Sequence, residues 1–210
     1  MAQHHRPPIE SGCPDGFQYM HPVMRRNYGN WDYHEHPRPG VLLHVADNGD
    51  KIWTVRAGTQ RILDVFTLRT LCKIGDEYAD GYVRFTIRSN IEYMMAEEAK
   101  VQPLIDALES EGFVVGGTKN SVAMISHTQG WLHCDIPGTD ASGVVKAMMD
   151  ELIDEFRENN MPNRVHITTS CCQINCGGQG DIAINIQHTK PPKINHELVS
   201  NVCERPSVVA

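Results

Sequence analysis

Seven cysteines are the residues in this 210-residue chain whose type and spacing could do chemistry. Three of them, Cys171, Cys172 and Cys176, fall within six residues, and three glycines follow in the four positions 177–180. Glycine lets a backbone approach a bulky ligand and turn its N–H groups towards anionic sulfur. Thiols this dense are prone to oxidation unless a metal holds them. The segment therefore predicts a metal or redox centre.

The residues alone leave three kinds of site open for these thiols. Zinc is disfavoured, because adjacent strand residues face opposite sides and the C-x2-C knuckle is absent. A second possibility is a set of buried thiols or a disulfide between Cys172 and Cys176. A cubane iron–sulfur cluster accepts adjacent ligands at separate iron corners, but it needs four thiolates. Cys134, in a turn rich in proline and glycine, is the best candidate for the fourth.

Composition and charge narrow the class of protein. The chain has 19 basic and 26 acidic residues, a net charge of −7, which argues against a nucleic-acid binder that works through overall charge. No stretch approaches the ~18 apolar residues of a membrane span, and residues 1–8 lack a secretory apolar region. We therefore expect a globular cytoplasmic protein with no nucleic-acid partner and no membrane insertion.

The spacing of apolar residues predicts the strands and helices that must position these residues. Apolar runs predict strands at 41–45, 52–55, 82–87, 122–126, 164–169 and 181–186, and helices are predicted at 67–78, 97–110 and 142–159. Residues 1–40 hold half of the twelve prolines and are interpreted as an irregular arm. The order favours an α+β fold of two sub-blocks that meet near Gly116 and Gly117. Cys72 is interpreted as a buried helix residue, and Cys13 and Cys203 as structural or solvent-facing thiols.

The cysteine motifs resemble those of the siroheme-dependent sulfite and nitrite reductase family, in particular its dissimilatory beta subunits. Cys172 and Cys176 match the family's C-x3-C, and Cys134 matches the first cysteine of its earlier C-x5-C. Asp140 stands where the second cysteine of that pair would fall, and Cys171 takes its place. The resemblance implies a [4Fe-4S] cluster held by these four cysteines, with Cys176 also bridging to the iron of siroheme.

A basic motif supports the same resemblance. Arg84, Thr86 and Arg88 resemble the family's R-x-T-x-R strand, which binds siroheme carboxylates. A tetrapyrrole with eight carboxylates needs several guanidinium groups, and alternate positions of a strand would place these three side chains on one face.

Four further positions are expected to line the substrate side. Arg56 lies in a segment resembling one that supplies a substrate arginine, and Lys119 stands where arginine is usual. Arg164 and His166 occupy positions that hold lysine in catalytic halves of the family. We therefore hypothesise that Cys176 carries the working siroheme while an alpha subunit supplies the substrate lysines. The pocket around Arg56, Arg164 and His166 would then face a second, structural tetrapyrrole.

The resemblance also implies an architecture and an activity. It predicts a ferredoxin-like half domain at 41–115, a siroheme- and cluster-binding α/β domain at 116–200, and the start of a truncated ferredoxin-type insert at 201–210. The implied reaction is the six-electron reduction of sulfite towards sulfide in sulfur or sulfate respiration. The implied partners are an alpha subunit in an α2β2 assembly and a small sulfur-carrier protein with C-terminal cysteines. A zinc-binding structural module and a thiol-redox protein are the alternatives.

Overall fold

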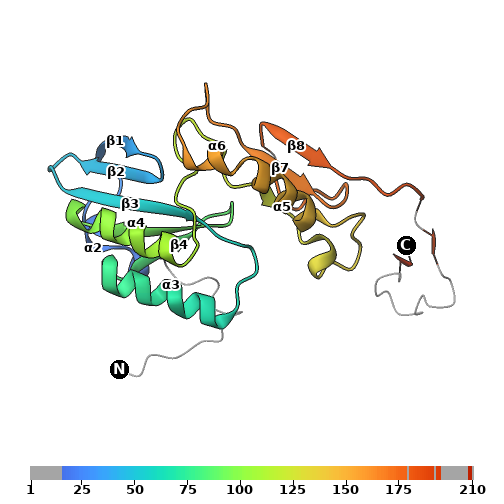
Figure 1. Ribbon diagram of the computed structural model, residues 1–210, viewed down its shortest axis with the longest axis horizontal. Helices are drawn as coiled ribbons and strands as arrows, with labels where there is room; N and C mark the ends of the chain where they lie inside the picture. The colour runs from blue at the N-terminus through green and yellow to red at the C-terminus, as the bar shows by residue number, and fades with distance from the viewer. Residues whose placement is uncertain (1–15, 179, 192, 195–207, 210) are drawn as a thin grey trace.

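The computed structural model describes residues 16–178, 180–191, 193–194 and 208–209. Two larger sheets, each with its own helices, follow one another along the chain (Figure 1), and two further short strands pair separately. All strands of the first sheet end before Gly116, and all strands of the second begin after Gly117. Cys13 and Cys203, and most of the predicted insert at 201–210, lie outside the described residues.

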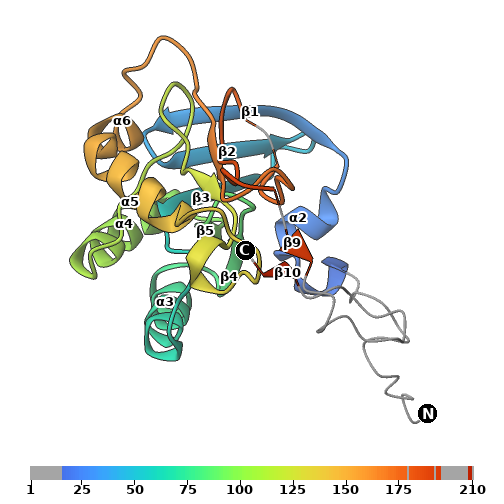
Figure 2. The same ribbon diagram turned by 90° about the vertical axis from the view of Figure 1, so that its right-hand side faces the viewer.

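The first sheet is antiparallel and has the order β1-β2-β3-β5-β4. Its strands are β1 (Trp31–Arg38), β2 (Val41–Ala46), β3 (Lys51–Gly58), β4 (Tyr82–Phe85) and β5 (Asn90–Met95). Helices α3 (Val65–Tyr78) and α4 (Val101–Ser110) cover one face (Figures 1 and 2). The core between them combines alternate apolar residues of the central strands with the helix stripes Leu71, Ile74, Val101, Leu104, Ile105 and Leu108. Alternation in the strands therefore leaves the other face of the sheet for polar side chains.

The second sheet is parallel and has the order β6-β7-β8. Its strands are β6 (Ser126–His127), β7 (Ile167–Ser170) and β8 (Ile182–Asn185), with helices α5 (Ala141–Glu151) and α6 (Ile153–Arg157). The side chains of Val145, Met149 and Phe156 pack with Val122, Ile125 and Ile167 in its core. Short elements complete the fold: the 3-10 turns η1 (Gly16–Tyr19), η2 (Glu98–Lys100) and η3 (Gly130–Leu132), helix α2 (Pro22–Arg26), and strands β9 (Lys193–Ile194) and β10 (Val208–Val209).

The junction between the two parts is packed on both sides. Gly117 has a φ of +67°, and a Cβ there would come within 2.6 Å of a ring carbon of Phe156. Its backbone N–H donates to the Phe156 carbonyl at 2.8 Å. On the other side, the N–H of Gly40 donates to the Thr118 hydroxyl at 2.9 Å. Glycine is needed here because only it combines a left-handed backbone with so close an approach.

Several sequence predictions are confirmed and several are wrong. The helices at 67–78 and 97–110 are found, and the second is followed by Gly112, which has a positive φ. The irregular arm is wrong for residues 22–26 and 31–38, which form α2 and β1. The helix at 142–159 divides at Leu152, and the strand at 122–126 is reduced to an isolated bridge at Val122 followed by β6. Cys72 is exposed, because it lies on the outer side of α3.

Candidate basic pocket and cysteine loops

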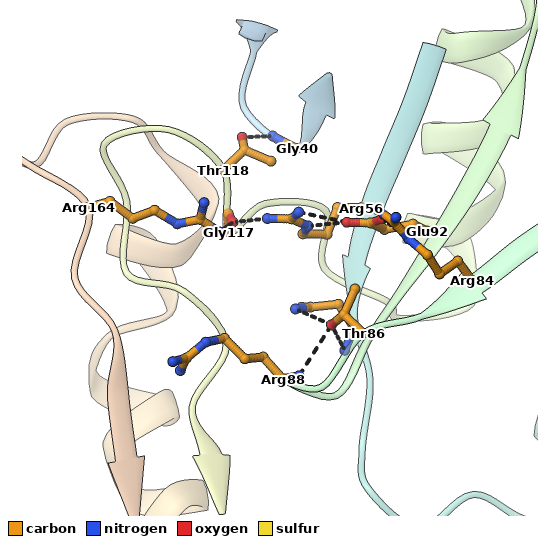
Figure 3. A network of polar contacts seen from close by, with 10 residues as sticks. Gly40, Arg56, Arg84, Thr86, Arg88, Glu92, Gly117, Thr118 and Arg164 are labelled. Atoms are coloured by element: carbon orange, nitrogen blue, oxygen red, sulfur yellow. Dashed lines mark hydrogen bonds and ion pairs between the residues drawn. The ribbon is translucent and has the colours of Figure 1, made fainter. Parts of the chain in front are cut away.

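Glu92 on β5 is fully buried, and its carboxylate lies between arginines of the two neighbouring strands (Figure 3). Arg56 on β3 donates from Nε to Oε1 at 2.7 Å. Arg84 on β4 donates from Nε to Oε2 at 2.8 Å, and its Nη2 contacts the same oxygen. Strand register puts the three residues in one row. Burial favours a raised pKa for Glu92, but the two guanidinium groups outweigh it and lower the pKa.

The guanidinium group of Arg56 donates its hydrogen bonds to other groups of the protein. Beyond its contacts with Glu92, its Nη1 donates to the Gly117 carbonyl at 2.7 Å. The Nη2 of Arg164, which lies just before β7, donates to the same carbonyl at 3.2 Å (Figure 3). The Arg56 side chain is 12% exposed, against 54% for Arg84. The structure therefore joins Arg56 and Arg164 at the junction, while Arg84 faces outwards.

The R-x-T-x-R segment differs from its expected geometry. Strand β4 ends at Phe85, so Arg84, Thr86 and Arg88 do not share one strand face. Thr86 instead accepts hydrogen bonds at its hydroxyl from the backbone N–H groups of Arg88 and Asn90, at 3.3 and 3.2 Å. This places Arg88 in the hairpin turn, from which its Nη1 donates to the Ile167 carbonyl of β7 at 3.3 Å. The turn thus directs Arg88 towards the second sheet.

The other two predicted substrate-side residues lie apart from the ion-pair row. Lys119 is exposed and has a φ of +51°. His166 interacts with Asp181, whose Oδ2 lies 3.1 Å from the imidazole Nδ1 and accepts the His166 backbone N–H at 2.8 Å. Of the four predicted residues, only Arg56 and Arg164 are therefore brought to a common contact.

Three of the four predicted cluster cysteines are neighbours. Cys171 and Cys172 follow β7 and are buried, and Cys134 follows η3 and is half-buried. The loop that follows Cys134 contacts this pair, because the backbone N–H of Gly138 donates to the Cys171 carbonyl at 2.8 Å. The loops are fixed by a hydrogen bond from the Cys171 N–H to the Thr128 hydroxyl, 2.8 Å long. The tertiary structure therefore brings Cys134 to the pair at 171–172.

These contacts distinguish the two adjacent thiols. Burial favours a raised pKa for Cys171, but hydrogen bonds from Thr128, Gly130 and the neighbouring thiols leave its pKa below the usual value. Burial raises the pKa of Cys172, and the neighbouring Cys171 adds to the effect. The Cys171 thiol therefore has a lower pKa than the adjacent Cys172 thiol.

Cys176 differs from the other three cysteines in its exposure. It is exposed, in a turn in which Asn175 has a φ of +53°. Asp140, at the position of the family's missing cysteine, precedes α5 and accepts a hydrogen bond from the Ser142 hydroxyl at 2.7 Å. Within the part of the chain that is described, no three His, Cys, Asp or Glu side chains stand together as a metal site.

The donor chemistry nevertheless fits the implied groups. Thiolates are the ligands of iron–sulfur clusters, and the loop that follows Cys134 contacts the loop of Cys171 and Cys172. The Nε of Arg164 is buried and has no hydrogen-bond partner among the residues described. An acceptor oxygen of a ligand would satisfy this buried donor, and carboxylate is the preferred partner of guanidinium.

Sequence reasoning missed Glu92, the residue that organises the arginine row. A signal was available, because Glu92 is the one charged residue in Asn90–Met95, a strand whose six residues are all buried. A buried carboxylate requires compensating partners, and arginines of the adjacent strands provide them. Strand β5 itself was not predicted, so this requirement was not recognised.

Comparisons with known proteins agree on one family. Residues 27–111 match the nitrite/sulfite reductase ferredoxin-like half domain, so the match begins within the predicted arm. The chain is 46% identical to the dissimilatory-type sulfite reductase subunit beta of Archaeoglobus fulgidus over 95% of its length, and spans 57% of that protein. It is 44% identical to the corresponding subunit of Megalodesulfovibrio gigas, over 92% of this chain and 77% of that protein.

The fold also agrees with this family. The crystal structure of dissimilatory sulfite reductase I matches with a TM-score of 0.74 and 14% identity, over 83% of this chain and 45% of that one. None of the helices in the described ranges is long and apolar enough to cross a membrane. Shared sequence over nearly the whole chain, together with the shared fold, shows that this chain belongs to the family of dissimilatory sulfite reductase beta subunits.

Proposed function

We propose that the chain forms part of the beta subunit of a dissimilatory sulfite reductase, which reduces sulfite by six electrons to sulfide in sulfur or sulfate respiration. The observation that carries this proposal is the 46% identity over 95% of the chain. Because the chain spans little more than half of that relative, the activity is proposed for the whole subunit in its assembly. The comparisons give no support to the zinc-module or thiol-redox alternatives.

The cysteine loops would hold the redox groups. Cys134, Cys171, Cys172 and Cys176 are proposed as ligands of a [4Fe-4S] cluster, and Cys176 also as a ligand of siroheme iron. When bound, these groups supply electrons and an iron position that can take the sulfur of sulfite. The protein's own part is to bury and orient the thiols, which the Thr128 hydroxyl does through the Cys171 backbone. Exclusion of water around Cys171 and Cys172 protects them from oxidation.

The basic pocket would bind the carboxylates of a tetrapyrrole. Arg84 offers an outward-facing guanidinium, Arg88 reaches towards the second sheet, and Thr86 fixes the turn between them. Arg56 and His166 support the hypothesis that the pocket of this chain faces a structural tetrapyrrole. Arg56 has each guanidinium nitrogen engaged by Glu92 or Gly117, and His166 interacts with Asp181. The lysines that bind and protonate sulfite would then come from the alpha subunit.

The same proposal covers domains, partners and compartment. Residues 41–115 would be the half domain, 116–200 the cofactor-binding domain, and 201–210 the start of a ferredoxin-type insert. An alpha subunit would complete an α2β2 assembly, and a small sulfur-carrier protein with C-terminal cysteines would receive the product. A cytoplasmic location fits thiolate ligands, because that compartment keeps them reduced.

The test is to produce the full-length beta subunit with its alpha subunit and purify the complex without oxygen. We expect iron, acid-labile sulfide, a tetrapyrrole absorption spectrum and sulfite-dependent oxidation of a reduced dye. Cys134→Ser should lower iron and sulfide content and activity. The matched control Cys72→Ser, at an exposed thiol of α3, should leave all of them unchanged.

Two results would overturn the proposal. A colourless complex with stoichiometric zinc would show a structural metal site. A metal-free complex with a reversible disulfide between Cys172 and Cys176 would show a thiol-redox protein. Unchanged iron and sulfide in Cys134→Ser would remove Cys134 from the ligand set and leave the other assignments to be tested singly.

A further inference from the structure

Two buried polar atoms of basic side chains on the two sides of the junction have no partner among the described residues. They are Nδ1 of His36 and Nε of Arg164. The two side chains act on each other electrostatically, since Arg164 is the strongest charged neighbour of His36. Most buried polar atoms in folded proteins are hydrogen-bonded, so these two atoms call for a partner that the described residues do not supply.

The position of His36 is set by an irregularity in the sheet. It lies on β1, where the pairing with β2 shifts register between Glu35 and Arg38. Such irregularities redirect side chains and are frequent beside functional sites. Here the side chain is half-buried among positive groups, which are Arg164, Arg56 and Lys119.

These surroundings keep His36 uncharged. Burial and the neighbouring cations lower its pKa, so the imidazole is neutral at neutral pH. A neutral imidazole can donate one hydrogen bond without adding a further charge to a crowded cationic site. The arginines already attract an oxyanion by their charge, so an additional hydrogen-bond donor to it should be neutral.

We propose that His36 is a further ligand-binding residue of this pocket, and that its Nδ1–H and the Nε–H of Arg164 donate to one oxyanion of the bound ligand. The inference rests on the proposed function. The oxyanion is a tetrapyrrole carboxylate or the sulfite group, and both present oxygens that accept such hydrogen bonds. Strand β1 would thereby contribute a residue to the site.

The experiment uses three replacements of His36 in the full-length beta subunit, assembled with its alpha subunit. His36→Asn places an amide N–H near the position of Nδ1, His36→Gln places it near Nε2, and His36→Leu removes it. The matched control is His34→Leu, because His34 lies on the same strand, is exposed and already has its Nδ1 2.8 Å from Nδ1 of His44. Thermal midpoints of all complexes are measured alongside.

Two arms separate the possible oxyanions. The first titrates iron-free sirohydrochlorin into pigment-depleted complex and follows its fluorescence, and the second measures the KM for sulfite. We expect His36→Leu and His36→Gln either to weaken sirohydrochlorin binding or to raise the KM for sulfite by about 10- to 100-fold. This is the effect of losing a hydrogen bond to a charged group. His36→Asn should retain most of the affinity, and His34→Leu all of it.

The inference is overturned if His36→Leu matches the wild type in both arms, or if Asn is no better than Leu. A change in pigment affinity alone assigns the oxyanion to the tetrapyrrole, and a change in KM alone assigns it to sulfite. Failure of the proposed function is a separate outcome, because the wild-type complex would then contain no tetrapyrrole. If His36→Leu does not assemble, the contrast between Asn and Gln still decides the matter.

Discussion

Replacement of Glu92 by glutamine tests whether the arginine row organises the pocket. The carboxylate is 0% exposed and receives Arg56, 12% exposed, on one oxygen and Arg84, 54% exposed, on the other. Glutamine keeps the shape but offers one acceptor oxygen and turns an N–H donor towards a guanidinium. Glu92→Gln therefore leaves a nearly buried arginine without its counter-charge.

The size of the effect follows from burial. Removing one partner of a buried ion pair costs about 3–5 kcal/mol, because the other charge stays desolvated. Most of this cost belongs to Arg56, and Arg84→Gln should cost no more than about 1 kcal/mol because solvent screens a half-exposed pair. With a urea dependence of about 2 kcal/mol per molar, Glu92→Gln should lower the unfolding midpoint by roughly 1.5–2.5 M.

The measurement is urea unfolding of the full-length subunit, followed by tryptophan fluorescence. The matched control is Glu109→Gln, the same chemical change at an exposed residue of α4, which should shift the midpoint by less than about 0.3 M, the effect of an ordinary surface substitution. A Glu92→Gln midpoint within that limit would refute the reasoning. So would an Arg84→Gln effect larger than that of Arg56→Gln.

Three further predictions concern stability. Gly117→Ala should lower the free energy of unfolding by about 2–4 kcal/mol, because it combines a left-handed backbone with a clash against Phe156. The control Gly49→Ala, at a φ of +86° in open space, should cost about 1 kcal/mol. Thermal unfolding measures both. Burial lowers the pKa of His44 from 6.5 to about 4. Between these two pH values the unfolded chain binds a proton at His44 and the folded chain does not, so the free energy of unfolding should be highest above pH 6.5 and fall towards pH 4. His44→Gln should reduce this fall in stability. Asp64→Ala should cost about 1 kcal/mol by removing the α3 N-cap, a hydrogen bond from the backbone N–H of residue 67, and Asp64→Asn should restore most of it.

Much of the fold could be predicted because its signals are local. The helix at 101–110 follows from apolar residues repeated at three and four positions, and its end from Gly112. Strand β1 could not be recognised in this way, because all eight of its residues are polar, aromatic or proline, and pairing with β2 stabilises it. Strand β4 ended early because Thr86 bonds to the backbone of the following turn rather than continuing the ladder.

The chemical identity of the candidate site was carried by the sequence, since three cysteines in six residues and the R-x-T-x-R segment are contiguous patterns. The tertiary structure decided which groups meet. Parallel strands bring Cys134 to Cys171, and strand register places Glu92 between two arginines. Side-chain periodicity is encoded within a few residues, whereas strand pairing joins segments far apart in the chain. A residue such as Arg56 can therefore be identified as basic from sequence, but whether its charge is free or already paired is settled only by its neighbours in space.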